Sequence, residues 1–241
     1  VTKLTVLGAT GSIGLNTLEI VRQFPHKFKI EALSCRSSIE RLVEQIKEFQ
    51  PRLVCVDNSE QARELRETFR NGCSGQESEF VWGVEGLVQV SSDPEVDLVV
   101  AGIVGAAGLQ PTFSAVQAGK TVAVANKEPL VMAGELFVQT ANKTGAKLLP
   151  TDSEHNAIFQ ALHGEPLERI ARLILTASGG PFRDLPLKEF EKITLAEALS
   201  HPNWEMGRKI SIDSATMMNK GLEIIEAHWL FNTPVENIDV L

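Results

Sequence analysis

The sequence predicts an α/β fold in two parts. The first is an N-terminal, Rossmann-like, doubly wound parallel sheet over residues 1–150, and the second is a smaller α+β catalytic domain over residues 151–241. Apolar runs of strand length alternate with amphipathic stretches of helix length, which is typical of a parallel sheet covered on both faces. A glycine-rich turn follows the first apolar run. The alternation stops after Thr151, so we place a domain boundary near Pro150.

The elements of the first domain follow in order from this alternation. The apolar runs expected to be strands are Leu4–Leu7, Phe28–Ser34, Leu53–Val56, Val96–Ala101, Thr121–Ala125 and Lys147–Leu149. The stretches expected to be helices are one that ends near Gln23, then Ile39–Phe49, Ser59–Phe69, Val84–Val90, Gly105–Ala118 and Leu130–Thr144. Residues 70–78 are expected to form a polar loop.

The second domain is expected to mix shorter elements. They are a strand over Ile170–Thr176, a loop over Ser178–Arg183, a short helix over Leu195–Leu199, a short strand over Ile210–Asp213 and a long helix over Met218–Phe231.

The composition favours small-molecule partners. The chain has 241 residues and a net charge of -8, and no Lys/Arg cluster could follow a nucleic-acid backbone, so we expect no nucleic-acid partner. No apolar run is long enough for a membrane span. Val1–Gly8 already has the pattern of a strand and turn, so we expect no signal or transit peptide. The three scattered cysteines suit a reducing compartment.

Gly8, Gly11 and Gly14 lie between the first predicted strand and the first predicted helix. Glycines at such a turn let the backbone approach a pyrophosphate, whose charge the helix N-terminus attracts. This context predicts a dinucleotide site. The alternative is a tight turn that holds no ligand.

The residues after the second predicted strand indicate which dinucleotide is bound. An NAD enzyme usually has an acid there for the ribose 2′-hydroxyl. This chain has Arg36, Ser37 and Ser38, a guanidinium and two hydroxyls that suit a 2′-phosphate. We therefore predict NADP; the alternative is that Arg36 only faces solvent.

Asn126, Lys127 and Glu128 follow a later predicted strand, at the sheet edge where doubly wound folds bind ligands. Lys127 is expected to contact the nicotinamide ribose or the substrate. The alternative is a charged strand end that is plain surface.

Asp152 and Glu154 are candidate metal ligands. At strand spacing, side chains two residues apart point to the same side. Two neighbouring carboxylates repel each other, and a hard divalent cation such as Mg²⁺ or Mn²⁺ resolves that conflict. The alternative is a solvated turn that caps a helix.

Two loops of the second domain carry polar or unusual residues. Ser178 precedes two glycines whose backbone N–H groups can form a small anion nest. Residues 201–207 combine Pro, Trp, Met and Gly, which suits a mobile lid that excludes water. The alternative is a surface loop whose Trp204 is anchored in the core.

The start of the last predicted helix carries a further polar group. Ser214, Asn219 and Lys220 suit a phosphate near a helix N-terminus. Glu223 lies on the same helix face as Asn219 and Lys220, at i+4 and i+3. We expect Glu223 to be a third metal ligand; the alternative is a Lys220–Glu223 salt bridge.

With these residues, the chain closely resembles the 1-deoxy-D-xylulose 5-phosphate reductoisomerase family of the non-mevalonate isoprenoid pathway. The matching segments keep the family's order: Gly8–Gly14, Ala125–Glu128, Asp152–Phe159, Ser178–Arg183, His201–Trp204, Met206–Ser211 and Asp213–Glu223. The chain departs from the family in having Arg36-Ser37-Ser38 where Gly-Lys-Asn is common. The family's helical C-terminal domain is expected to be absent after Leu241.

The resemblance implies an NADPH-dependent enzyme that uses Mg²⁺ or Mn²⁺. It would convert a phosphorylated ketose, 1-deoxy-D-xylulose 5-phosphate, to 2-C-methyl-D-erythritol 4-phosphate by rearrangement and reduction. The implied metal ligands are Asp152, Glu154 and Glu223. The implied substrate-binding residues, several of them around the phosphate, are Lys127, Ser153, Glu154, Ser178, His201, Ser214, Asn219, Lys220 and Glu223. The implied cofactor contacts, beside Gly8, Gly14 and residues 36–38, are Thr10, Gly11, Ser12, Ile13, Asn126, Glu128 and Gly207.

For catalysis we expect Glu154, helped by Lys127, to move the hydroxyl protons, while Asp152 and Glu223 complete the metal site. The resemblance also implies a homodimer in the bacterial cytoplasm or the plastid stroma. Two other functions stay open. A metal-free NADP-dependent sugar or semialdehyde dehydrogenase would need a nucleophilic Cys or a catalytic Tyr, and the chain has no Tyr. The other is an NADP-binding module without catalysis.

Overall fold

The computed structural model describes residues 1–70, 78–166, 169–200 and 207–241. The chain divides into two compact units, Val1–Asp152 and Ser153–Leu241. Each unit is described by itself.

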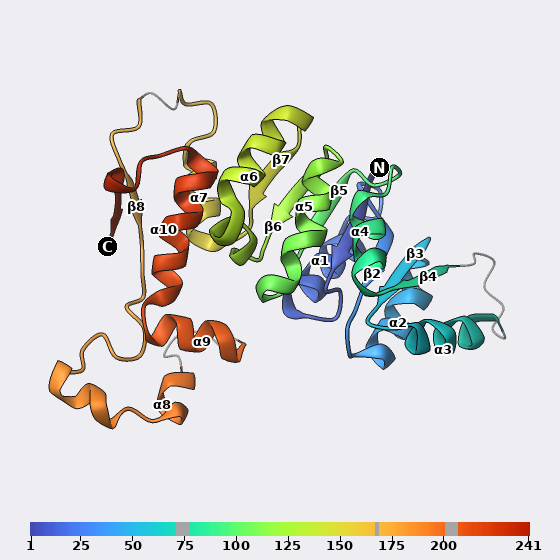
Figure 1. The fold of residues 1–241 in the computed structure, drawn as a ribbon, viewed down its shortest axis with the longest axis horizontal. Coiled ribbons are helices and arrows are strands. Elements are labelled where there is room, and N and C mark those ends of the chain that lie inside the picture. Colours follow the sequence, from blue (N-terminus) through green and yellow to red (C-terminus); the bar gives the residue numbers. More distant parts are fainter. Residues whose placement is uncertain (71–77, 167–168, 201–206) are drawn as a thin grey trace. The chain divides into compact units, whose positions relative to one another are not determined.

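The first unit alternates strands and helices along the chain (Figure 1). Its elements are β1 (Thr2–Leu7), α1 (Ser12–Gln23), β2 (Phe28–Ser34), α2 (Ile39–Phe49), β3 (Leu53–Val56), α3 (Ser59–Arg70), β4 (Glu79–Trp82), α4 (Gly83–Ser92), β5 (Leu98–Ala101), η1 (Gly105–Gly108), α5 (Leu109–Gln117), β6 (Thr121–Val124), α6 (Glu128–Thr144) and β7 (Lys147–Pro150).

These strands form one parallel, seven-stranded sheet in the order β4-β3-β2-β1-β5-β6-β7. The order runs outward from β1 to β4, then returns to place β5, β6 and β7 on the other side of β1. This is a doubly wound sheet, so the predicted fold class of this part is confirmed. In such a sheet, ligands bind where the order reverses, here between β1 and β5.

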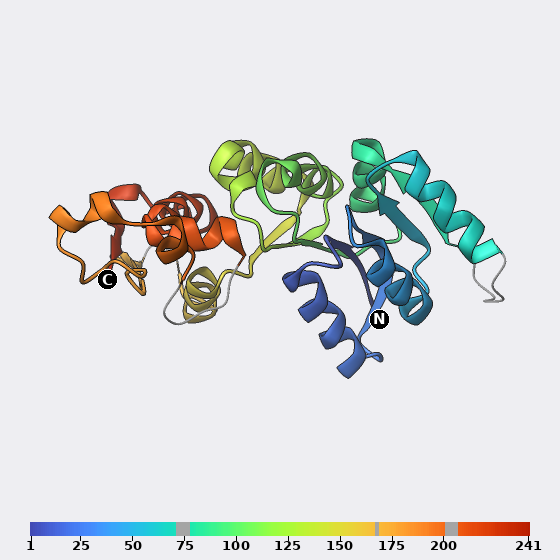
Figure 2. The same cartoon turned by 90° about the horizontal axis from the view of Figure 1, so that it is seen from below.

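Helices cover both faces of this sheet, which is why its strands are nearly continuous apolar runs. On one face, a core cluster joins α1, α2 and α3 to the strands through buried residues such as Leu18, Leu42 and Leu65. Helices α4, α5 and α6 lie on the opposite face (Figure 2). The central strands contribute Val6 and Val99, neither of which is exposed to solvent.

Strand β4 is one element that the sequence analysis missed. It is a four-residue edge strand in which only Phe80 is buried, while Glu79 and Trp82 are exposed. One buried position gives no alternation for a pattern to detect. Of the predicted polar loop, residues 71–77 lie outside the described residues, and Arg70 ends α3.

In the described residues of the second unit, helices of different lengths accompany two short strands. Its elements are α7 (Ser153–Ala161), β8 (Leu173–Leu175), η3 (Leu187–Lys192), α8 (Leu195–Leu199), α9 (Arg208–Ala215), α10 (Met218–Phe231), η4 (Val235–Asn237) and β9 (Ile238–Val240). Strands β8 and β9 pair in parallel, with Leu173 opposite Ile238. Their apolar residues pack with Ala227 and Phe231 of α10 into the core of this unit.

The predicted strand over Ile210–Asp213 is wrong, because these residues lie within helix α9. Ile-Ser-Ile-Asp alternates apolar and polar residues, but the surrounding contacts have helical spacing. The Ser211 hydroxyl donates to the Gly207 carbonyl at 3.1 Å, and Lys209 pairs with Asp213 at 2.7 Å. An alternating pattern of only four residues is weak evidence for a strand, and the i,i+4 contacts favour the helix.

Among the described residues, no helix has both the length and the apolar character that crossing a membrane would require.

Candidate functional site

The glycine-rich turn between β1 and α1 lies at the sheet edge where the strand order reverses. Gly8 has a φ of 80°, and a Cβ atom there would lie 3.0 Å from the carbonyl oxygen of Gly102, just after β5. At Gly14, a Cβ atom would lie 2.5 Å from backbone atoms of Gly8 and Ala9. Glycine is needed at both positions, because a side chain would collide with backbone atoms that cannot move aside.

Neighbouring elements hold this turn in place. The Gly8 amide donates to the Ser34 hydroxyl of β2 at 3.0 Å. From α2, Gln45 Nε2 donates to the Ala9 carbonyl at 3.0 Å, and Arg41 Nη1 donates to the Thr10 carbonyl at 3.2 Å. Helix α2 thus fixes two successive carbonyls of the turn. Of the other predicted cofactor residues here, Gly11 is the N-cap of α1, Ser12 and Ile13 open that helix, and Ile13 is exposed.

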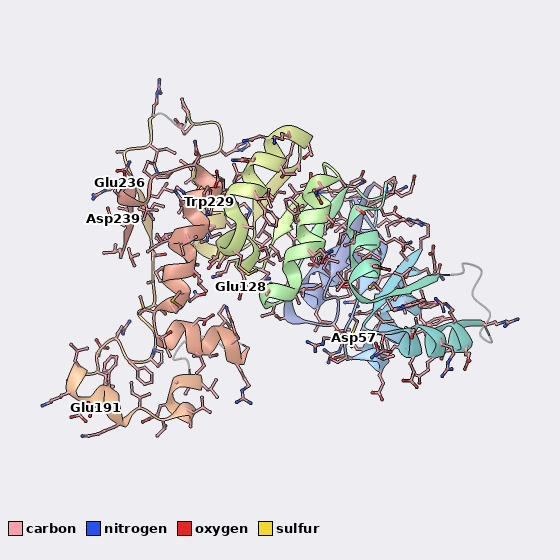
Figure 3. The ribbon with its side chains drawn as sticks, viewed as in Figure 1. Asp57, Glu128, Glu191, Trp229, Glu236 and Asp239 are labelled. Atoms are coloured by element: carbon pink, nitrogen blue, oxygen red, sulfur yellow. The ribbon has the colours of Figure 1, made fainter. Side chains whose placement is uncertain are left out.

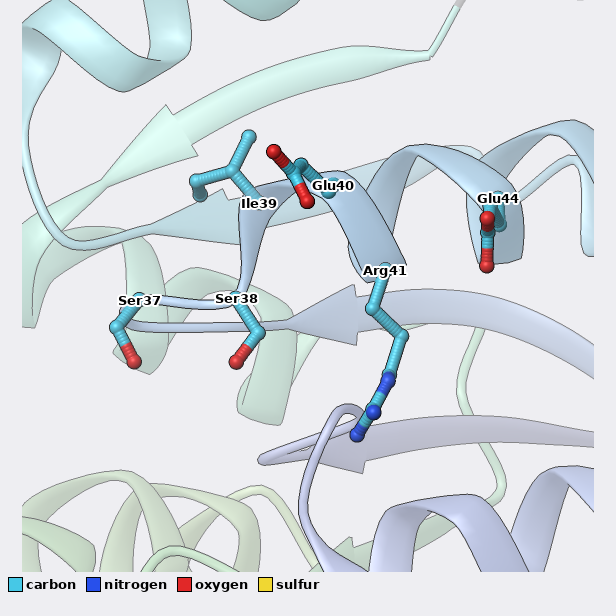
Figure 4. Close-up of a pocket in the computed structure, with 6 residues that line it drawn as sticks. All are labelled: Ser37, Ser38, Ile39, Glu40, Arg41 and Glu44. Atoms are coloured by element: carbon cyan, nitrogen blue, oxygen red, sulfur yellow. The ribbon is translucent and has the colours of Figure 1, made fainter.

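A cavity of about 590 Å³ opens beside the end of β2 (Figure 4). It contains two of the predicted 2′-phosphate residues, and its lining is Ser37, Ser38, Ile39, Glu40, Arg41 and Glu44. Arg36 is not in this lining; its side chain is 86% exposed, with Nε 3.8 Å from Asp57 Oδ1. The sequence analysis missed Arg41, although its position one turn into α2 after Ser38 could have indicated it.

Further predicted site residues of the first unit lie just after strands β6 and β7. Asn126 is buried, and its Nδ2 donates to the Gly105 carbonyl at 2.9 Å. Lys127 is also buried, and its Nζ lies 2.5 Å from Asp152 Oδ2. Glu128 is the first residue of α6 (Figure 3). The ammonium of Lys127 therefore neutralises one of the predicted metal ligands.

The strand spacing predicted for Asp152 and Glu154 is wrong. Strand β7 ends at Pro150, and Ser153 begins helix α7, so Glu154 lies in the first turn of a helix. A helix start was the alternative interpretation. The Ser153 hydroxyl donates to Glu154 Oε2 at 2.6 Å.

Helix α10 brings three predicted residues to one place. Asn219 Nδ2 donates to Glu223 Oε1, and Lys220 Nζ donates to Glu223 Oε2. The shared helix face predicted from the i+3 and i+4 spacing is therefore present, and so is the alternative Lys220–Glu223 salt bridge. Lys220 Nζ also lies 3.5 Å from Glu154 Oε1. One ammonium thus lies between two carboxylates, and Glu223 is only 1% exposed.

A small cavity of about 50 Å³ lies next to this group in the second unit. Ser178, Ser214, Asn219 and Lys220, all predicted to bind substrate, contribute to its lining. The full lining is Ala177, Ser178, Gly179, Gly180, Ser214, Met217, Asn219 and Lys220. Lys220 therefore lines this cavity and contacts both carboxylates. Its Nζ also donates to the Thr176 carbonyl at 2.6 Å, which fixes the ammonium at the cavity wall.

A buried histidine of α7 contacts the backbone of α10 at Glu223. His155 of α7 is completely buried, with Nε2 2.9 Å from the backbone carbonyl oxygen of Glu223. Its ring stacks on Phe231 with a centroid distance of 6.3 Å and an interplanar angle of 9°. Glu226 Oε2 lies 3.7 Å from the same nitrogen. These contacts fix the backbone that carries Glu223, a role that the sequence analysis did not assign.

Some predicted residues stay untested by this geometry. His201, Trp204 and Met206 lie outside the described residues. Gly207 is exposed and is the N-cap of α9.

Two family models match the chain. The model described as 1-deoxy-D-xylulose 5-phosphate reductoisomerase matches residues 4–134, and the model of that family's C-terminal domain matches residues 148–231. Proteins with the reductoisomerase name from Dechloromonas aromatica (strain RCB) and Shouchella clausii (strain KSM-K16) are 53% and 52% identical to it. Both alignments cover 99% of this chain, which spans 61% and 62% of the length of these relatives.

Solved structures agree with these matches. A DOX-P reductoisomerase in complex with NADPH, fosmidomycin and magnesium superposes with a TM-score of 0.90 at 46% identity, covering 100% of this chain and 60% of that chain. The Zymomonas mobilis reductoisomerase in complex with NADPH superposes with a TM-score of 0.90 at 40% identity, covering 99% of this chain and 60% of that one.

Proposed function

Because the chain belongs to the 1-deoxy-D-xylulose 5-phosphate reductoisomerase family, we propose that it converts 1-deoxy-D-xylulose 5-phosphate to 2-C-methyl-D-erythritol 4-phosphate with NADPH and a divalent metal. One observation carries this proposal. Lys220 belongs both to the lining of a polar cavity and to the Glu154–Glu223 pair. An anion cradle therefore adjoins a pair of carboxylates, Glu154 of α7 and Glu223 of α10, which suits a substrate with a phosphate at one end and metal-binding oxygens at the other.

The carboxylates of the second unit fit a hard divalent cation. Glu154 and Glu223 offer oxygen donors of the kind that Mg²⁺ and Mn²⁺ bind, and a metal would share buried Glu223 with the Lys220 ammonium that already pairs with it. Asp152 precedes Glu154 by two residues, so chain connectivity alone keeps these two carboxylates near each other. We assign all three as ligands of Mg²⁺ or Mn²⁺. When bound there, the metal would supply Lewis acidity toward the ketone and hydroxyl oxygens of the substrate.

The chain's own residues position and deprotonate the substrate. The Lys220 ammonium, the hydroxyls of Ser178 and Ser214 and the amide of Asn219 bind the phosphate, which orients the reacting carbons. Ser153 and His201 are assigned to the same substrate. A carboxylate oxygen of Glu154 accepts the substrate hydroxyl proton, and Lys127 assists near Asp152.

The first unit binds NADPH in this proposal. Its glycine turn at the switch point between β1 and β5 approaches the pyrophosphate, and the cavity beyond β2 takes the adenosine end. Asn126 and Glu128 extend the same sheet edge, and Gly207 is assigned as a contact from the second unit. We accordingly assign residues 1–150 as the cofactor domain and residues 151–241 as the catalytic domain. A solved relative carries NADPH, fosmidomycin and magnesium together, which supports the pairing of cofactor and metal.

The finer assignments extend the same proposal. We propose Mn²⁺ as an alternative to Mg²⁺, a homodimer as the working form and the bacterial cytoplasm as the location. Activity assays with each metal, light scattering in solution and fractionation of the source cells test them in turn.

The experiment that tests the function measures NADPH oxidation at 340 nm with 1-deoxy-D-xylulose 5-phosphate, with Mn²⁺ and with EDTA. We expect turnover only with metal. A Mn²⁺ titration followed by electron paramagnetic resonance accompanies it, for the wild type, Glu223→Gln and Glu236→Gln. Glu236 is an exposed carboxylate of the same unit (Figure 3) and serves as the matched control.

Loss of tight Mn²⁺ binding in Glu223→Gln alone supports the ligand assignment. Equal affinities in both variants contradict it. Metal-independent turnover favours a metal-free dehydrogenase, and NADPH binding without turnover favours a non-catalytic module.

A further inference from the structure

Arg41 is the guanidinium best placed to discriminate between the two nicotinamide dinucleotides. Building on the proposed function, we propose that Arg41, and not Arg36, binds the 2′-phosphate of NADPH and sets the preference for NADPH over NADH. The adenine ribose would lie against Ser37 and Ser38.

The first support is the geometry of the cavity beside β2. In Figure 4 the hydroxyls of Ser37 and Ser38 and the guanidinium of Arg41 point toward the same side, while the carboxylate of Glu40 points away. Glu44 lies a turn further along α2. Ser38 is the N-cap of α2, yet its side chain makes no capping hydrogen bond, so its hydroxyl is not committed to its own helix. Two hydroxyls and a guanidinium form a donor set that a phosphate dianion prefers.

The second support is the anchoring of Arg41 to the glycine turn. Its Nη1 donates to the Thr10 carbonyl at 3.2 Å, and one turn later Gln45 donates to the Ala9 carbonyl at 3.0 Å. A guanidinium has five N–H donors, so this bond orients the group and leaves others for a ligand. The position of the 2′-phosphate site is thereby fixed relative to the turn that meets the pyrophosphate, as recognition of one dinucleotide requires.

The third support is the different situation of Arg36. Its side chain is 86% exposed, and its Nε lies 3.8 Å from Asp57 Oδ1. Both arginines are exposed, but Arg41 lines the cavity and is anchored to the Thr10 carbonyl, whereas Arg36 lies outside that lining and its guanidinium is partly neutralised by Asp57. Arg41 is therefore the residue whose loss should change cofactor preference.

The experiment measures dissociation constants for NADPH and for NADH by quenching of protein fluorescence, at one fixed salt concentration. The variants are Arg41→Met, Arg41→Lys, Arg36→Met and, as a matched control, Arg63→Met. Arg63 is an exposed arginine on α3 of the same unit. Circular dichroism confirms that each variant is folded, and Arg41→Lys keeps the test usable if Arg41→Met does not fold.

We expect Arg41→Met to weaken NADPH binding by about ten- to a hundredfold and NADH binding by less than about threefold, because only NADPH carries the lost contact. Arg41→Lys should recover part of the preference, since it keeps a charge but not the planar fork. Arg36→Met and Arg63→Met should each change the NADPH/NADH ratio by less than about threefold.

Three results would overturn the inference. In the first, Arg41→Met keeps the wild-type preference. In the second, Arg36→Met removes it instead. In the third, Arg41→Met weakens both cofactors equally, in which case Arg41 only shapes the turn. A wild-type protein that binds neither cofactor would overturn the proposed function as well, so the two failures can be told apart.

Discussion

Lys127 and Asp152, which follow the adjacent strands β6 and β7, form a largely buried ion pair with 2.5 Å between Nζ and Oδ2. The pair fixes the last residue of the first unit just before α7 begins. A carboxylate proposed to bind metal is therefore already held by the protein's own cation.

Removing this carboxylate should destabilise the protein measurably. Asp152→Asn leaves the Lys127 ammonium buried beside a neutral amide, so we expect the free energy of unfolding to fall by about 1–3 kcal/mol in metal-free buffer. Asp57→Asn, which alters an exposed pair at 3.8 Å, is the control and should change it by less than about 0.5 kcal/mol. Urea denaturation followed by circular dichroism gives both values. Equal losses in the two variants would contradict a stabilising role for the pair.

Lys220 should oppose metal binding and favour anion binding at the same site. Its ammonium contacts Glu223 and lies 3.5 Å from Glu154, so it competes with a metal for both charges. We expect Lys220→Gln to bind Mn²⁺ up to about tenfold more tightly and inorganic phosphate more weakly. Electron paramagnetic resonance and calorimetry measure the two affinities. The exposed Lys188→Gln of η3 is the control, and weaker Mn²⁺ binding in Lys220→Gln would refute the expectation.

The glycine turn should tolerate a methyl group at one position and not at another. A Cβ atom at Gly14 would lie 2.5 Å from backbone atoms of Gly8 and Ala9, whereas at Gly11 the nearest atom would be 3.4 Å away. We expect Gly14→Ala to lower the free energy of unfolding by about 3 kcal/mol and to weaken NADPH binding. Gly11→Ala should change the stability by less than about 1 kcal/mol. Thermal denaturation of the two variants side by side checks this difference.

The pH dependence of stability should contain a small term from one surface pair. Arg22 of α1 donates from Nε and Nη2 to the two oxygens of Glu48 on α2, at 2.5 and 2.7 Å. The hydrogen bonds from Arg22 hold the pKa of Glu48 below its ordinary value of 4.5, against the opposing effect of desolvation. Because the pKa of Glu48 is lower in the folded state than in the unfolded state, its charge stabilises the folded protein at pH values above the ordinary pKa. This stabilisation is lost as the pH falls through the lowered folded-state pKa.

Glu48→Gln should therefore cost about 0.5 kcal/mol at pH 7, a small value because both side chains are more than 40% exposed. The difference from wild type should disappear once the pH has fallen below the lowered folded-state pKa of Glu48, where the carboxyl is protonated in both the folded and the unfolded state. Urea midpoints across this pH range measure it, with Glu64→Gln on α3 as control. A difference that persists at low pH would show that Glu48 acts through packing and not through its charge.

The doubly wound sheet could be predicted because strands that are buried on both faces consist of nearly continuous apolar residues, which are visible in the sequence. The grouping of Asn219, Lys220 and Glu223 was also accessible, because i+3 and i+4 spacing is a local property of one helix. Strand β4 was missed because an edge strand buries little.

Other features depend on tertiary contacts that spacing does not encode. Asp152 and Glu154 were placed at strand spacing, but the chain turns into α7 between them. Arg41 gains its importance from the carbonyl of Thr10, far away in the sequence. Arg36, which the basic pattern favoured, lies beside Asp57 because β2 and β3 end next to each other.

The parallel pairing of β8 with β9 also has a consequence for synthesis of the chain. Leu173 meets Ile238, so α8, α9 and α10 all lie in the intervening polypeptide. On the ribosome, every strand of the first unit has been made once Pro150 emerges, whereas β8 must wait until Val240 leaves the exit tunnel. During that interval Leu173 and Leu175 lack their native partner strand, and a nascent chain stalled there would offer an apolar target to chaperones while its first half is already folded.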